Sequence, residues 1–93
     1  MKAIWRGIVI AESNYVEKID GDIYFPPYAM KKKYFSDSSK KTKNISIGEA
    51  QYFHITVNGV VNQDSAWIYK DPMNDYKQIK NYIAFWRGVK IEE

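Results

Sequence analysis

The chain has 93 residues, a length that predicts one domain over residues 1–93. Hydrophobic residues make up 45% and charged residues 27%, and no apolar run has the length of a membrane span, so we expect a cytoplasmic protein without membrane contact. The absence of cysteine excludes disulfides, thiolate zinc sites and cysteine catalysis.

The net charge of +3 is concentrated in one segment. Residues 31–43 contain six lysines against one acid, Asp37, so this segment carries +5 and the other residues sum to −2. The lysines are Lys31, Lys32, Lys33, Lys40, Lys41 and Lys43. The basic character therefore belongs to one region and not to the whole domain.

The N-terminal half begins with two predicted hairpins. "KAIW" and "IVIAES" are apolar strands separated by Arg6-Gly7, where glycine can take the positive φ of a two-residue turn. "NYVEKIDGDIYF" repeats the pattern around Asp20-Gly21. In "PPYAMKKKYF" the spacing of apolar residues becomes helical, and "SDSSKKTKN" has no periodicity. A short helix followed by a polar loop is therefore expected here.

The C-terminal half contains the strongest hairpin signal. Asn58-Gly59 lies between the β-rich arms "IGEAQYFHITV" and "VVNQDSAWIY", as in type I′ turns. "DPMNDYKQIKN" predicts a break at Asp71-Pro72 and then one or two helical turns, and "YIAFWRGVKIEE" predicts a last hairpin. The predicted fold class is mainly β, with antiparallel hairpins forming two packed sheets and two short helices.

The triplet Trp-Arg-Gly occurs twice, at residues 5–7 and 86–88. In both copies the tryptophan ends a short apolar run and a second apolar run follows the glycine. Turn chemistry explains this spacing, so we interpret both triplets as hairpin turns with Gly7 and Gly88 at positive φ. The alternative is a paired Trp/Arg site that binds an anionic aromatic ligand.

Five stretches, "MKAIWRGIVIAES", "IYFPP", "GEAQYF", "AWIYKDP" and "IAFWRGVKIEE", carry a family resemblance over nearly the whole chain. In this order and spacing they resemble a bacterial group of small proteins, the domain-of-unknown-function family 427, sometimes labelled a nucleotidyltransferase-like domain. The resemblance implies a mainly β fold similar to the β-tent of methionine-sulfoxide reductase B and of the ligand-binding domain of cereblon. It implies no established activity.

The chain departs from this family just before "GEAQYF". Members usually carry a cysteine, a proline, an aromatic residue and a lysine there, whereas this chain has Asn44, Ile45, Ser46 and Ile47. A cysteine- or lysine-dependent family activity would therefore be lost, and the paired Cys-x-x-Cys zinc knuckles of β-tent relatives are impossible.

Other candidate catalytic features have simpler explanations. Asp20-Gly21-Asp22 has the Asp-x-Asp pattern of two-metal nucleotidyltransferases, but no phosphate-binding glycine loop accompanies it, so a hairpin turn is favoured. His54 is the only histidine, and no serine or cysteine nucleophile motif accompanies it. We expect no metal, no cofactor and no catalytic residue.

The Asn58-Gly59 turn predicts which residues share a face, because side chains alternate along a strand. Phe53, Ile55, Val57, Val60, Ala66 and Ile68 fall on one face, and Tyr52, His54, Thr56, Trp67 and Tyr69 on the other. Asn62 and Asp64 fall on the apolar face, so a bulge is expected there, and such a bulge would exchange the downstream faces.

Three functional hypotheses follow. The first is a binding module for an unidentified small molecule or peptide, with an aromatic pocket between β-sheets lined by Tyr24, Tyr52, His54, Trp67, Tyr69 and Trp86. These rings would equally pack in a core or at a subunit interface.

The second hypothesis is weak binding of nucleic acid or another anionic partner through the lysines of residues 31–43. These lysines would otherwise form a solvated helix face and loop. The third is a nucleotide-acting enzyme. The oligomeric state stays open.

Overall fold

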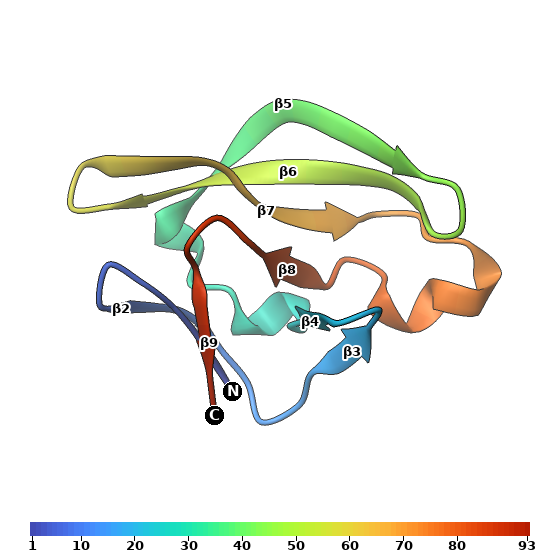
Figure 1. Cartoon of the computed structure of the whole chain (residues 1–93), viewed down its shortest axis with the longest axis horizontal. Helices are drawn as coiled ribbons and strands as arrows, with labels where there is room; N and C mark the ends of the chain where they lie inside the picture. Colours follow the sequence, from blue (N-terminus) through green and yellow to red (C-terminus); the bar gives the residue numbers. More distant parts are fainter.

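The computed structural model describes all 93 residues and contains nine strands in three antiparallel sheets (Figure 1). The first sheet has the order β2-β1-β9 and is built from β1 (Lys2–Trp5), β2 (Ile8–Glu12) and β9 (Lys90–Glu92). The second is a ribbon of β3 (Glu17–Ile19) and β4 (Asp22–Tyr24). The third has the order β5-β6-β7-β8 and contains β5 (Phe35–Asn44), β6 (Gly48–Val57), β7 (Val60–Tyr69) and β8 (Ile83–Phe85). The mainly β prediction is confirmed, and none of the sheets closes into a barrel.

The two predicted helices are wrong. The structure has only short 3-10 turns, at η1 (Pro27–Ala29), η2 (Lys32–Tyr34) and η3 (Asn74–Ile79). Between η1 and η2, Met30 is extended because it bridges to Ala11, and the Lys31 amide donates to the Ile10 carbonyl at 2.9 Å. Pairing with β2 therefore prevents a continuous helix. None of the helical turns has the length or hydrophobicity needed to span a bilayer.

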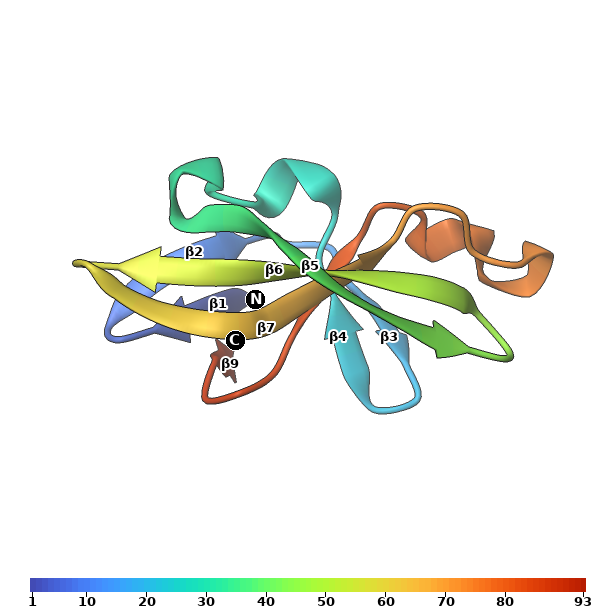
Figure 2. The same ribbon diagram turned by 90° about the horizontal axis from the view of Figure 1, so that it is seen from above.

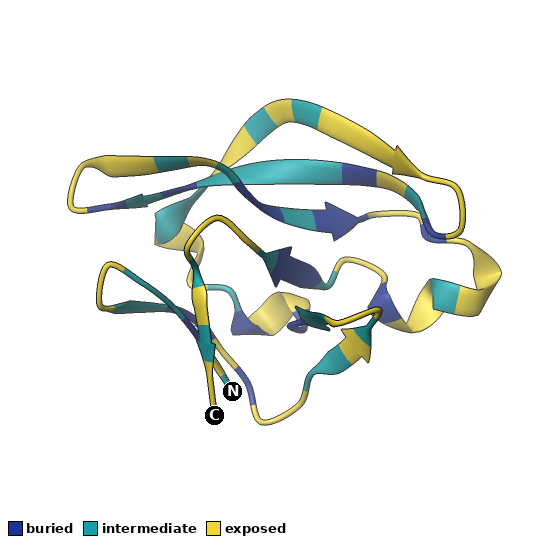
Figure 3. Cartoon of the chain, viewed as in Figure 1, coloured by how far each residue is buried: buried dark blue, intermediate teal, exposed yellow.

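The segment predicted as a polar loop, residues 36–44, is part of the ten-residue strand β5. It lies at the edge of the four-stranded sheet, and most of its residues are exposed (Figure 3). Edge strands commonly carry lysines and bulges, which discourage pairing with a further strand. Such a strand needs no apolar alternation, and the sequence pattern therefore failed to reveal it.

Both Trp-Arg-Gly triplets are turns, but only the first closes a hairpin. Arg6 and Gly7 have φ of 51° and 76° and join β1 to its partner β2. Gly88 has φ of 85°, as predicted, yet β8 pairs with β7 and β9 with β1. The second triplet therefore links two sheets. The two turns lie close together, since a Cβ on Gly88 would be 3.9 Å from the Trp5 indole nitrogen.

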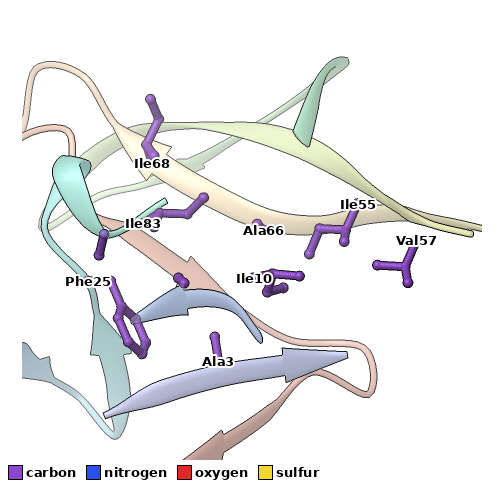
Figure 4. Close-up of a cluster of buried hydrophobic side chains, with 10 residues drawn as sticks. Ala3, Ile10, Phe25, Ile55, Val57, Ala66, Ile68 and Ile83 are labelled. Atoms are coloured by element: carbon purple, nitrogen blue, oxygen red, sulfur yellow. The ribbon is translucent and has the colours of Figure 1, made fainter. Parts of the chain in front are cut away.

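The main core lies between the three-stranded and four-stranded sheets (Figure 4). Seen from above, β6 and β7 pass across β1 and β2 (Figure 2). Phe25 lies in this core with Ala3 and Ile10 of the three-stranded sheet, and its backbone pairs in both directions with Ile83 of the four-stranded sheet. Its ring packs edge-on against Phe85. The core residues are Ala3, Ile10, Ala11, Phe25, Ala29, Ile55, Val57, Ala66, Ile68 and Ile83.

A second cluster covers part of the opposite face of the four-stranded sheet, which we call the outer face. It contains Tyr24, Ile47, Ala50, Tyr69, Ile79 and Ala84. Ile79 comes from η3 and Tyr24 from β4, so these two segments shield one part of the outer face. The four-stranded sheet therefore has apolar side chains on both sides: Ile55 and Val57 of β6 lie in the main core, as predicted for their face, and Ala50 lies in the second cluster.

Phe25→Ala is expected to lower the free energy of unfolding by about 3–5 kcal/mol, because it removes a fully buried ring from the joint between the sheets. Urea unfolding measures this change. Tyr28→Ala is the control. The Tyr28 side chain, three residues further along the chain, is 77% exposed, and its loss should cost less than about 0.5 kcal/mol. Equal effects of the two substitutions would contradict the assigned core.

Candidate functional site

A bulge in β7 shapes the outer face. The pairing of β6 with β7 shifts between Ile55↔Asn62 and Phe53↔Ala66, so Gln63, Asp64 and Ser65 oppose His54 alone. The predicted bulge is present, but the predicted exchange of faces is wrong. The bulge adds two residues, an even number, so alternation resumes unchanged and Trp67 pairs directly with Tyr52.

Side chains from β6 and from the turn after β8 bind the backbone of this bulge. Asp64 has φ of 54°, and its amide donates to Nδ1 of His54 at 3.1 Å. Its carbonyl accepts from the Trp86 indole N–H, and the Gln63 carbonyl accepts from Arg87 Nη1 at 3.0 Å. Because unpaired backbone groups are costly when shielded from water, the second Trp-Arg-Gly triplet serves to cap the bulge.

A second bulge, in β5, lies on the other side of β6. Residues Ser38, Ser39 and Lys40 oppose Tyr52 alone. The Ser38 hydroxyl donates to the Asp64 carboxylate and accepts from the Lys40 amide, so the two bulges are tied together across β6. Sequence reasoning missed Ser38 because it assigned this segment to a loop. The sequence pattern indicates Asp64 only as a polar residue that falls on the apolar face of its strand.

Three aromatic rings meet above these bulges, from Tyr52 on β6, Trp67 on β7 and Trp86 just after β8. We call them the aromatic cluster. Their ring centroids are 6.1–6.3 Å apart in every pair, and the two indoles are perpendicular. Tyr52 and Trp67 are half-buried, whereas Trp86 is 41% exposed. The cluster therefore presents ring surface to solvent.

Two predicted ligand residues lie below this surface and are buried. Tyr24 is 2% and Tyr69 6% exposed, within the second cluster. The Trp67 indole N–H donates to the Tyr24 hydroxyl at 3.3 Å, reaching past Ala84, its small partner on β8. Burial raises the pKa of both tyrosine hydroxyls above the usual range. These two residues support the cluster from beneath.

No pocket lies between the β-sheets, where the sequence predicted one. The space between the sheets is filled by the main core, and the rings that were expected to line a cavity pack against one another. The structure brings Tyr52, His54, Trp67 and Trp86 together on the outer face, as an open surface.

Two cations border the aromatic cluster. Lys40 Nζ lies 5.5 Å from the Tyr52 ring centroid, and the Arg87 guanidinium carbon lies 4.5 Å from that of Trp86. Neither forms an ion pair, since the ion pairs of the chain are His54–Asp64, Lys77–Asp71 and Lys90–Glu92. Both cations therefore keep N–H groups available for a bound anion.

Of the six lysines in residues 31–43, only Lys40 reaches the aromatic cluster. Lys41 and Lys43 pair with Gln51 and Glu49, which alternate with Tyr52 and so point to the opposite side of the sheet. The others, Lys31, Lys32 and Lys33, lie around η2, before β5 begins. The lysine run is thus not one anion-binding surface.

His54, Asp64 and Ser38 contain the residue types of a catalytic triad but not its arrangement. In a triad, histidine lies between the serine and the carboxylate and removes the serine proton. Here the Ser38 hydroxyl donates its hydrogen bond to the Asp64 carboxylate, and His54 Nδ1 accepts a hydrogen bond from the Asp64 backbone amide. Ser38 is therefore not activated as a nucleophile, and no three His, Asp or Glu side chains come together as metal ligands.

Comparison with protein-family models gives a match over the whole chain. The family model described as "Domain of unknown function (DUF427)", with the label NTP_transf_9, matches residues 1–93, the whole chain. No curated protein matches. The matched family has no assigned activity, so the function must be argued from the outer face.

The buried tyrosines predict loss of stability at alkaline pH. Because burial raises the folded-state pKa of Tyr24 and Tyr69, the unfolded chain loses these protons first, and stability should fall as pH rises above about 10. Tyr24→Phe should flatten this fall while lowering stability at neutral pH, because it also removes the Trp67 hydrogen bond. Urea unfolding of both proteins between about pH 8 and pH 11 measures the slopes. Identical slopes would contradict the assignment.

Proposed function

The chain belongs to the DUF427 family, and we propose that it is a binding module that holds a planar group of its ligand against the aromatic cluster on the outer face. The observation that carries this proposal is the mutual packing of Tyr52, Trp67 and Trp86 at a surface where Trp86 stays 41% exposed. Aromatic rings with polar tips are enriched where proteins bind partners, because they offer large rigid contact area.

The support beneath the cluster suits a binding surface. Tyr52 is fixed by a contact between its hydroxyl and that of Thr42 at 3.1 Å, and Trp67 by Tyr24 at 3.3 Å. Trp86 is fixed by the carbonyl of Asp64. A surface with its rings already oriented loses little conformational entropy when a ligand binds.

The open shape of the surface favours one kind of ligand over another. Pockets that hold small molecules tightly bury most of the ligand surface, and this chain has no pocket. A planar group that belongs to a longer molecule, such as a peptide or a nucleic acid, needs only a surface that one ring can stack on. The aromatic cluster supports this second mode better than enclosure of a metabolite.

A nucleotide-acting enzyme receives no comparable support. Asp20 and Gly21 form the turn of the β3–β4 ribbon, with φ of 51° and 86°, which explains the Asp-x-Asp pattern as turn chemistry. Ser38 and His54 do not contact each other as nucleophile and base would. The family label therefore gives no reaction that these residues would perform.

Binding of adenosine and of indole, as uncharged planar probes, tests the proposal. Adenosine should quench tryptophan fluorescence of the wild-type protein, and at about 100 times its dissociation constant either probe should stabilise the fold by about 2.7 kcal/mol. Trp86→Ala should abolish the effect. Trp5→Phe is the matched control, because Trp5 belongs to the other Trp-Arg-Gly triplet and packs, half-buried, against the main core.

Two results would contradict the proposal. One is that neither adenosine, indole nor any oligonucleotide or aromatic peptide changes the fluorescence or the melting temperature. The other is that Trp86→Ala, shown to be folded by circular dichroism, binds the probes as well as the wild-type protein does.

A further inference from the structure

We propose that the ligand of the aromatic cluster is single-stranded nucleic acid, with bases stacked on Trp86 and Tyr52 and with phosphates at Lys40 and Arg87. This inference rests on the proposed function and names the partner of the same surface. Single strands are commonly bound by exposed rings next to basic side chains, because every base has a face that stacks.

The charge around the rings points to an anion. Lys40 lies over the ring of Tyr52 and Arg87 over that of Trp86, and neither has a carboxylate partner. Asp64, in the β7 bulge, accepts a hydrogen bond from the Ser38 hydroxyl and lies 3.8 Å from His54. Its carboxylate therefore already has two partners within the protein.

The same contacts argue against a cationic ligand. Aromatic clusters elsewhere bind quaternary ammonium groups through the negative faces of their rings. Here the protein's own Lys40 and Arg87 lie 5.5 and 4.5 Å from the ring centroids of Tyr52 and Trp86. A bound cation would meet the repulsion of both charges, whereas an anion would be attracted by both.

The arrangement suits a strand better than a free mononucleotide. Arg87 uses one guanidinium N–H on the Gln63 carbonyl and keeps the others for a phosphate. Lys40 is on β5 and Arg87 follows β8, the two outer strands of the four-stranded sheet, so two separate phosphates can engage them while bases stack on the rings. A mononucleotide has its charge at one end only, and the open surface would bury little of it.

Binding of a fluorescently labelled oligothymidylate of roughly 12 nucleotides, followed by anisotropy, tests this inference. Two phosphate contacts on a single strand predict that log K falls with log salt at a slope of about −1.4, roughly a sevenfold loss of affinity between about 50 and 200 mM salt. Trp86→Ala should weaken binding by roughly 5- to 150-fold, as expected for loss of one stacked base.

The decisive comparison uses two double variants with the same loss of charge. In Lys40→Gln/Arg87→Gln the slope should approach zero. In Lys41→Gln/Lys43→Gln, which removes neighbouring lysines that point to the other side of β5, affinity and slope should stay close to wild type. Thermal unfolding of each variant establishes that the fold is retained, which matters because Arg87 also caps the β7 bulge.

Each contrary outcome has one meaning. Equal losses in the two double variants would overturn the inference, because binding would then follow net charge alone. Adenosine or adenosine monophosphate binding as tightly as the oligonucleotide would also overturn it, while leaving the proposed function standing. Failure of every planar probe to bind, charged or uncharged, would overturn both.

Discussion

The hydrogen bonding of the β7 bulge is the constraint on which the outer face depends. Three residues of β7 oppose one residue of β6, so several backbone groups lose their regular partners. Trp86, Arg87 and His54 supply replacements, and this requirement fixes where an indole and a guanidinium lie. Trp86 and Arg87, two of the side chains proposed to bind a ligand, are therefore held by backbone groups that cannot be left unpaired at low cost. The proposed binding surface thus depends on the bulge of β7.

The four-stranded sheet serves two purposes because both of its faces are apolar. One face forms the main core with β1, β2 and Phe25. The other face carries the second cluster on one part and the exposed aromatic cluster beside it. Tyr24 and Trp67 lie at the boundary between the second cluster and the exposed rings. Tyr24 is buried, Trp67 is half-buried, and a hydrogen bond joins them. The surface is thereby an extension of a packed core, and its rings have little freedom to move.

Local patterns revealed what depends on local chemistry. The Asn58-Gly59 turn fixed the register of β6 and β7 well enough to place Tyr52 and Trp67 on one face, and both Trp-Arg-Gly turns have their glycine at positive φ. What failed depended on distant partners. Strand β5 has no apolar alternation because it is a polar edge strand. Met30 is extended because β2 pairs with it. Whether the bulge adds an odd or an even number of residues cannot be read from Asn62 to Asp64 alone. The absent pocket is of the same kind, because only the packed structure shows that side chains fill the space between sheets.

The pairing of β1 with β9 has a consequence for how the protein folds. Lys2 lies opposite Glu92, so the central strand of the first sheet gains its second neighbour only when segments separated by almost the whole sequence meet. Closing such a long loop costs entropy before any contact compensates it, and folds dominated by distant pairings reach the native state in milliseconds to seconds. Until that closure, the edge of β1 is unpaired and Ala3 lacks part of its cover. In a newly made chain this is the interval in which association with other chains competes with folding.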